Sequence, residues 1–134
     1  MTVVTNAVTE TPAAAPERAA EHFAALLSLE TDCWDVHEAL AAGSAGFVLL
    51  DVRGRGGWDA GHVEGATHLP HRELTAERLD EYPSETLFVV YCAGPHCNGA
   101  DRAALRLARL GRPVKKMVGG VTGWLDEGFP LATG

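Results

Sequence analysis

The chain has 134 residues, which suits one domain with a single hydrophobic core. Hydrophobic residues make up 46% and charged residues 22% of it, as in ordinary soluble globular proteins. The formal net charge of −7 argues against nucleic acid or a membrane as a partner. The start of the chain lacks a signal sequence, and no apolar run approaches the ~20 residues that cross a bilayer. We therefore expect a cytoplasmic protein.

Two segments precede the expected domain. Residues 1–15 are rich in Thr, Ala and Pro and predict a disordered tail. Over 16–30, apolar residues such as Phe23 and Leu27 recur at helical spacing and predict an extra N-terminal helix. We expect its apolar stripe to dock onto the domain or a partner, a homodimer through this helix included. The domain itself is expected over 31–134.

The rest of the chain alternates between helical and strand patterns. A helix is expected from about 33 to 42, with Asp32 as its N-cap and Gly43 as its end. Two continuous apolar runs, at 47–52 and 87–91, are typical of strands buried on both faces of a parallel sheet. This alternation predicts an α/β fold with three layers. The remaining expected elements are a helix over about 98–110, a strand over 114–118 and a helix over 121–127.

Cys92 follows the second apolar run, where open α/β sheets collect their chemistry. Gly94 and Gly99 in the following loop permit unusual backbone angles, so its N–H groups can turn inward. The helix expected from Asn98 adds the positive end of its dipole. Together these features favour a reactive Cys92 thiolate over a cysteine that only packs in the core.

Several segments of the chain resemble the motifs of the rhodanese-like domain family, in the family's order. The resemblance covers residues 31–131 and implies a rhodanese-like three-layer sandwich with about five parallel strands. The matching segments are LLDVR (49–53), WDAGHVEGA (58–66) with LP (69–70), VVYC (89–92), and GGVTGW (119–124) with GFP (128–130).

The resemblance also implies a function, that of a rhodanese-type transferase similar to thiosulfate sulfurtransferase. Catalytic Cys92 would accept a sulfane sulfur from thiosulfate, a persulfide or a mercaptoacid. It would hold this sulfur as a persulfide and pass it to a thiol or to cyanide. No metal or organic cofactor is needed. The active-site loop that would bind the substrate comprises Ala93, Gly94, Pro95, His96, Cys97 and Asn98.

This loop departs from the family pattern. The family carries a glycine three positions after the cysteine and a basic residue five positions after it, where this chain has Pro95 and Cys97. The missing cation argues against thiosulfate as the preferred donor, unless protonated His96 replaces it. Asn98 stands where a cysteine-based phosphatase would carry its arginine, so phosphatase activity is not expected.

Cys97 leaves two interpretations open. It could attack the Cys92 persulfide, expel sulfide and form a disulfide. Alternatively, it packs beneath the loop at the start of the helix, which is the simpler interpretation because tight loops often point such neighbours apart.

Outside the loop, most of the remaining polar and aromatic residues have structural explanations. Asp51 and Arg53 are expected to form an ion pair after a buried strand. Alternatively, Arg53 lies near the pocket and attracts an anion. His62 is interpreted as a structural histidine, His68 and His71 as surface or edge residues. Trp124 is expected in the core.

Two further functions remain as alternatives. A non-catalytic rhodanese-like interaction module is compatible with the unusual loop and the extra helix. A zinc-binding domain is the other, because Cys92 and Cys97 have ligand-like spacing and the chain has six histidines. Cys33 has no motif around it and is interpreted as a packing residue.

Overall fold

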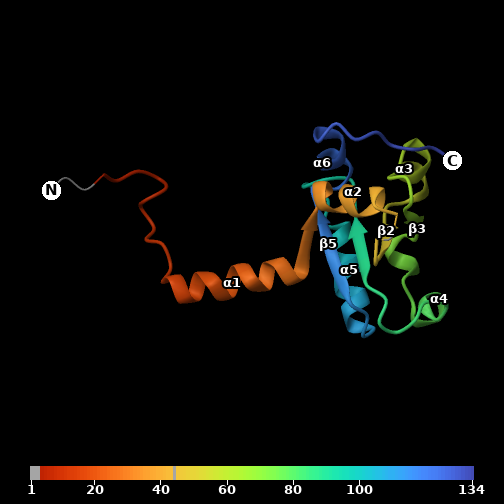
Figure 1. Cartoon of the computed structure of the whole chain (residues 1–134), viewed down its shortest axis with the longest axis horizontal. Helices are drawn as coiled ribbons and strands as arrows, with labels where there is room; N and C mark the ends of the chain where they lie inside the picture. The colour runs from red at the N-terminus through yellow and green to blue at the C-terminus, as the bar shows by residue number, and fades with distance from the viewer. Residues whose placement is uncertain (1–3, 44) are drawn as a thin grey trace.

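The computed structural model describes residues 4–43 and 45–134, which form a five-stranded parallel sheet with helices on both faces (Figure 1). The strand order is β1-β5-β4-β2-β3, and every neighbouring pair is parallel. This confirms the predicted α/β class. The strands are β1 (Glu30–Asp32), β2 (Val48–Asp51), β3 (Thr67–His68), β4 (Phe88–Tyr91) and β5 (Val114–Val118). The helices are α1 (Pro16–Leu29), α2 (Cys33–Ala41), α3 (Arg55–Ala60), α4 (Ala76–Leu79), α5 (Gly99–Arg109) and α6 (Gly120–Asp126), with a 3₁₀ turn η1 (His71–Glu73).

The sheet has a hydrophobic core on each face, because successive side chains of a strand point to opposite sides. Leu50 and Val90 belong to the core that α4 and α5 cover, whereas Leu49 and Val89 belong to the core under α2 and α6. All four are buried, as the continuous apolar runs predict. The helices contribute Leu79 from α4, Ala103 and Leu107 from α5, Val36 from α2 and Trp124 from α6.

The longer predicted elements are confirmed to within about one residue at each end. Helix α2 begins after Asp32, whose carboxylate accepts a hydrogen bond from the Asp35 N–H at 2.8 Å. Gly43, with a φ of 86°, follows its end. Strand β5 covers the expected residues, and α6 begins one residue earlier than expected. These elements have clear caps or continuous apolar runs in the sequence.

Five short elements, β1, β3, α3, α4 and η1, were not predicted from the sequence. Strands of two or three residues and a helix of four are too short to show a periodicity. Strand β1 nevertheless completes one edge of the sheet, where Glu30 pairs in register with Lys116 of β5. Their side chains also form an ion pair at 3.3 Å.

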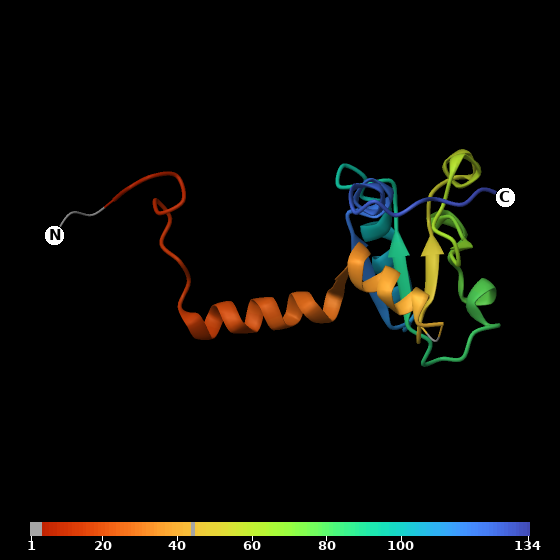
Figure 2. The ribbon, with the colours of Figure 1, turned by 45° about the horizontal axis from the view of Figure 1, so that its top comes forward.

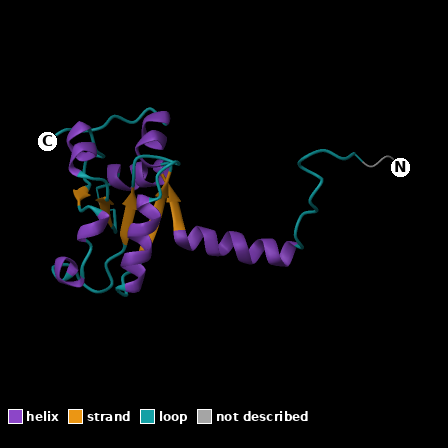
Figure 3. Cartoon of the chain, turned by 180° about the vertical axis from the view of Figure 1, so that it is seen from behind, coloured by secondary structure: helices purple, strands orange, loops and turns teal. Residues whose placement is uncertain are grey.

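Helix α1 extends away from the domain, as Figures 2 and 3 show from two further directions. The helix is present as predicted, with Pro16 in its first turn. Its expected docking onto the domain is not observed, because every residue from Pro16 to Leu29 is exposed except half-buried Ala19. Docking onto a partner stays a prediction. Residues 1–3 of the predicted tail lie outside the described residues.

The helices of the described part of the chain are all too short or too polar to cross a membrane.

Candidate active site

Cys92 lies directly after β4, at the edge of the sheet where the parallel strands end. The neighbouring strand β2 ends beside it, because Asp51 and Tyr91 pair in register. The Cys92 side chain is 6% exposed and belongs to the core that α5 covers. Cys92 therefore lies just beyond the carboxyl end of a buried parallel strand, as predicted from the sequence.

A buried polar network fixes the two strand ends next to Cys92. The Arg53 guanidinium donates hydrogen bonds to the Asp51 carboxylate, the shortest at 2.7 Å, and to the Gly61 carbonyl at 2.6 Å. The Tyr91 hydroxyl donates to Asp51 at 2.7 Å and accepts from the Val63 N–H at 3.0 Å. The expected ion pair is confirmed, and Tyr91 is a member that the sequence analysis did not find.

Burial and charge act together on this network. Burial opposes the charge of Arg53, but the hydrogen bond and negative charge of Asp51 outweigh it and raise the pKa of the guanidinium. Burial, reinforced by the Asp51 charge, raises the pKa of Tyr91 well above its usual range. Tyr91 is thus a neutral hydrogen-bond donor that holds Asp51 and, through the chain, the start of the loop.

The loop after Cys92 turns back so that its two cysteines meet. The Cys97 N–H donates to the Gly94 carbonyl at 3.0 Å, which closes the turn. Cys92 and Cys97 are joined by a disulfide, with their Cα atoms 6.4 Å apart, within the normal range for such bonds. The expectation that a tight loop points the two side chains apart is wrong, whereas Cys97 does pack against the core near the start of α5, as the simpler interpretation predicted. The attacking role of Cys97 stays a prediction.

The two loop glycines are required for a different reason from the one predicted. The positive-φ glycines of the described chain do not include Gly94 or Gly99. Instead, because each glycine lacks a side chain, atoms of neighbouring residues can pack directly against its backbone. A Cβ atom on Gly99 would lie 2.8 Å from the Cys92 Sγ and 3.3 Å from the Cys97 Sγ. A Cβ atom on Gly94 would lie 2.6 Å from the Thr122 hydroxyl.

Helix α6 holds the first residues of the loop. The Val121 N–H donates to the Cys92 carbonyl at 3.1 Å, and the Thr122 N–H donates to the Ala93 carbonyl at 3.0 Å. Gly120, with a φ of 57°, lies against the Cys92 carbonyl, where a side chain would collide with the backbone. The glycine at the start of α6 therefore allows the C-terminal segment to dock against the backbone of Cys92.

Two cavities open beside the loop, and both cysteines line each of them. The larger has a volume of about 590 Å³ and is also lined by Ala93, Asn98 and Arg53, whose guanidinium is already bound to Asp51. The smaller, of about 240 Å³, is also lined by Gly94 and Pro95. His96, weighed from the sequence as a substitute cation when protonated, is exposed and lines neither of these two cavities.

The larger cavity has a basic wall that the sequence analysis did not find. Arg72 of η1 and Arg102 of α5 line it together with His71, which had been expected as a surface or edge residue. Its described lining residues include no carboxylate. Burial, together with the charges of nearby Arg72, Arg106 and Arg102, lowers the pKa of His71. The cavity is thus a locally cationic region on an acidic protein.

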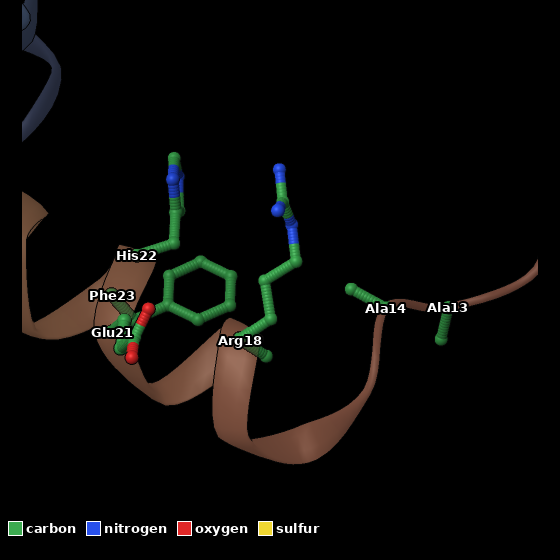
Figure 4. Close-up of a pocket in the computed structure, with 7 residues that line it drawn as sticks. Ala13, Ala14, Arg18, Glu21, His22 and Phe23 are labelled. Carbon is green, nitrogen blue, oxygen red and sulfur yellow. The ribbon is translucent and has the colours of Figure 1, made fainter.

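A third hollow, of about 720 Å³, lies away from the loop, between the N-terminal tail and α1 (Figure 4). Ala14, Arg18, His22 and Phe23 are among its lining residues. Phe23 is 59% exposed, so this hollow is an open concavity of the projecting segment. No cysteine is among the residues that line it, so it is separate from the candidate site around Cys92.

The structural roles expected for other residues are confirmed. His62 is buried, stacks on Trp58 and contacts the Trp58 carbonyl at 2.9 Å. Trp124 is buried and donates to the Pro130 carbonyl at 3.0 Å. His68 lies on edge strand β3. Across the described residues, no three His, Cys, Asp or Glu side chains are grouped as a metal site requires.

Cys33 is expected to resist alkylation in the reduced protein. It is buried on the opposite face of the sheet from Cys92, and burial, aided by the charges of Asp32 and Glu127, raises the pKa of its thiol to about 11. At neutral pH the thiol therefore stays protonated and unreactive. After reduction, iodoacetamide followed by peptide mass mapping should label Cys92 and Cys97 well before Cys33. Labelling of Cys33 at the same rate would contradict this assignment.

Comparison with known proteins agrees with this architecture. The model of the rhodanese-like domain family matches residues 35–127, and the chain belongs to this family. The chain is 40% identical over 105 residues to the HTH-type transcriptional regulator Rv0324 of Mycobacterium tuberculosis (strain ATCC 25618 / H37Rv). This match covers 72% of the chain but only 46% of that relative.

Solved structures show the same fold. The crystal structure of the BH2092 protein from Bacillus halodurans superposes with a TM-score of 0.85 and 31% identity, covering 89% of this chain and 87% of that one. Thiosulfate sulfurtransferase from Pseudomonas aeruginosa superposes with a TM-score of 0.65 and 24% identity, covering 87% of this chain and 21% of that one. This second likeness concerns the fold alone.

Proposed function

We propose that the protein is a sulfurtransferase that carries a sulfane sulfur as a persulfide on Cys92. The observation that carries this proposal is the position of Cys92, at the end of β4, in the wall of a cavity whose charged side chains are cationic. The family includes sulfurtransferases, and the name of the Pseudomonas protein gives one such activity. The proposed donors are thiosulfate, a persulfide or a mercaptoacid, and the proposed acceptor is a thiol or cyanide.

The proposed reaction starts once the Cys92–Cys97 disulfide has been reduced. The Cys92 thiolate attacks the outer sulfur of the donor and forms a new S–S bond. The donor's own bond to that sulfur breaks, and its remainder leaves with the electron pair, as sulfite in the case of thiosulfate. An acceptor nucleophile then attacks the outer sulfur of the persulfide, and Cys92 leaves as the thiolate. Atoms and electrons balance over the two steps.

The surroundings of Cys92 favour the anionic species of this cycle. Helix α5 begins at Gly99, against the Cys92 sulfur, so the positive end of its dipole faces the thiolate and the persulfide. Arg72 and Arg102 supply, from outside the loop, the cation that the loop lacks. We therefore include anionic donors such as thiosulfate, although the loop sequence alone argued against it.

Replacement of Cys92 by serine is expected to abolish sulfur uptake. The reduced protein would be incubated in turn with thiosulfate, glutathione persulfide and mercaptopyruvate, and intact mass would be measured. We expect Cys97→Ser, which has no second loop thiol to attack the persulfide, to gain one sulfur atom, mapped to Cys92, with at least one donor. The double variant Cys33→Ser/Cys97→Ser is the matched control and should take up sulfur like Cys97→Ser. Equal transfer to cyanide by the wild type and Cys92→Ser would overturn the proposal.

Removal of the basic wall is expected to weaken binding of an anionic donor. Arg72→Gln and Arg102→Gln should each raise the KM for thiosulfate by roughly tenfold, the effect of losing a hydrogen bond to a charged group. The matched control is Arg109→Gln, which removes an exposed arginine at the other end of α5. Steady-state kinetics with thiosulfate and cyanide would measure this. An unchanged KM in both cavity variants would remove the assigned role.

A second candidate function is a non-catalytic module within a longer regulatory protein. The observation that favours it is the 40% identity to part of a protein named as an HTH-type transcriptional regulator. In that case the chain would bind a ligand or partner at the loop without turning over sulfur. The cyanide assay distinguishes the two, because this candidate requires no difference between the wild type and Cys92→Ser.

A further inference from the structure

We propose that Cys97 is a resolving cysteine that attacks the Cys92 persulfide and releases its outer sulfur as sulfide. This inference rests on the proposed persulfide and extends it, because it makes the first acceptor a residue of the same loop. The protein would then reduce sulfane sulfur to sulfide, and an external dithiol would supply the electrons. A transferase with a single reactive cysteine would instead pass the sulfur intact to its acceptor.

The loop geometry brings the two sulfur atoms together without any rearrangement of the fold. Cys92 and Cys97 are bonded, and their Cα separation of 6.4 Å matches ordinary disulfides. The turn closed by the Cys97 N–H and the Gly94 carbonyl, at 3.0 Å, directs Cys97 back toward β4. Gly99 leaves room for the pair, since a Cβ atom there would lie within 3.3 Å of both sulfur atoms.

The surroundings of Cys97 favour a nucleophile. The Gly99 N–H donates a hydrogen bond to the Cys97 Sγ at 3.4 Å, and this N–H belongs to the first turn of α5. Both the N–H group and the helix dipole stabilise a thiolate. Cys97 is half-buried and lines both cavities. It is therefore more exposed to a soluble reductant than Cys92, which is 6% exposed.

The step balances without an external oxidant. The Cys97 thiolate attacks the Cys92 Sγ of the protonated persulfide and forms the Cys92–Cys97 bond. The bond from Cys92 to the outer sulfur breaks, and this sulfur leaves as HS⁻ with its proton and the electron pair. The sulfane sulfur is reduced, and the two cysteines are oxidised to the disulfide. A dithiol reductant then restores both thiols and is itself oxidised.

The test follows a single turnover of the reduced protein under anaerobic conditions. The wild type, Cys97→Ser, Cys97→Ala and Cys33→Ser would each receive one equivalent of glutathione persulfide, with a donor-free sample alongside. We expect the wild type and Cys33→Ser to release sulfide and lose two hydrogen atoms in intact mass. Both Cys97 variants should keep one extra sulfur on Cys92 and lose the sulfide burst. Further turnovers of the wild type should require added dithiothreitol.

The outcomes separate this inference from the proposed function. A wild type that keeps the extra sulfur and releases no sulfide overturns the resolving role and leaves the transferase intact. Disulfide formation that is equally fast without the donor also overturns it. The persulfide itself is overturned if neither Cys97 variant gains sulfur and the wild type neither gains sulfur nor releases sulfide. Circular dichroism of the serine and alanine variants verifies that each is folded before the comparison is made.

Discussion

Replacement of Asp51 by alanine is expected to lower the free energy of unfolding by about 3–5 kcal/mol, the usual effect of removing one partner of a buried ion pair. Asp51 is fully buried, and its carboxylate holds both Arg53 and the Tyr91 hydroxyl. Its loss would leave the 12%-exposed Arg53 side chain with an uncompensated charge. Urea unfolding followed by tryptophan fluorescence would measure the change.

The matched control for this prediction is Asp59→Ala. Asp59 also forms an ion pair with an arginine, Arg55, but the two side chains are 61% and 80% exposed. Such a surface pair contributes roughly 0–1 kcal/mol. If Asp51→Ala cost no more than Asp59→Ala, the network would not be what holds the ends of β2 and β4 together.

Replacement of Gly99 by alanine is expected to reduce sulfur uptake by about a hundredfold or more. The added methyl group would lie 2.8 Å from the Cys92 Sγ, so the sulfur, the loop or the start of α5 must move. A displacement on the order of 1 Å in a reactive group is enough for an effect of this size. The measurement is the rate of sulfur transfer from thiosulfate to cyanide, with the thermal unfolding midpoint recorded for the same sample.

Gly56→Ala is the control for Gly99→Ala. Gly56 lies in helix α3, and a Cβ atom built there meets nothing within 4 Å. The same chemical change in a helix should therefore leave the rate unaltered. A Gly99→Ala protein as active as Gly56→Ala would show that the close packing around the sulfur pair is not needed.

The fold could be predicted in outline because its main elements carry local signals. The apolar runs that became β2 and β4 are of the length and composition typical of strands buried on both faces of a sheet. Asp32 and Gly43 marked the ends of α2 by their capping chemistry. The short elements carried no such signal. Strand β1 exists because its backbone pairs with β5, an interaction that three residues of sequence do not display.

The candidate site was predictable only where it is contiguous in the chain. The position of Cys92 follows from β4, and the loop follows from Cys92. The basic wall depends on tertiary structure, because Arg72 and Arg102 come from η1 and α5 and meet only in the folded protein. The pairing of Cys92 with Cys97 depends on the direction of the turn at Gly94, which residue spacing alone does not give.

The hydrogen bonds to α6 hold only the first two residues of the loop, so the loop has an anchored part and an exposed part. The carbonyls of Cys92 and Ala93 are anchored by Val121 and Thr122, and α6 in turn is anchored in the core by Trp124. The stretch 95–98 makes no such hydrogen bonds to α6 among those of the described residues and is mostly exposed. When the sulfur–sulfur bond forms or breaks, the conformational change can therefore be confined to these few surface residues, while the backbone of Cys92 and Ala93 stays in place.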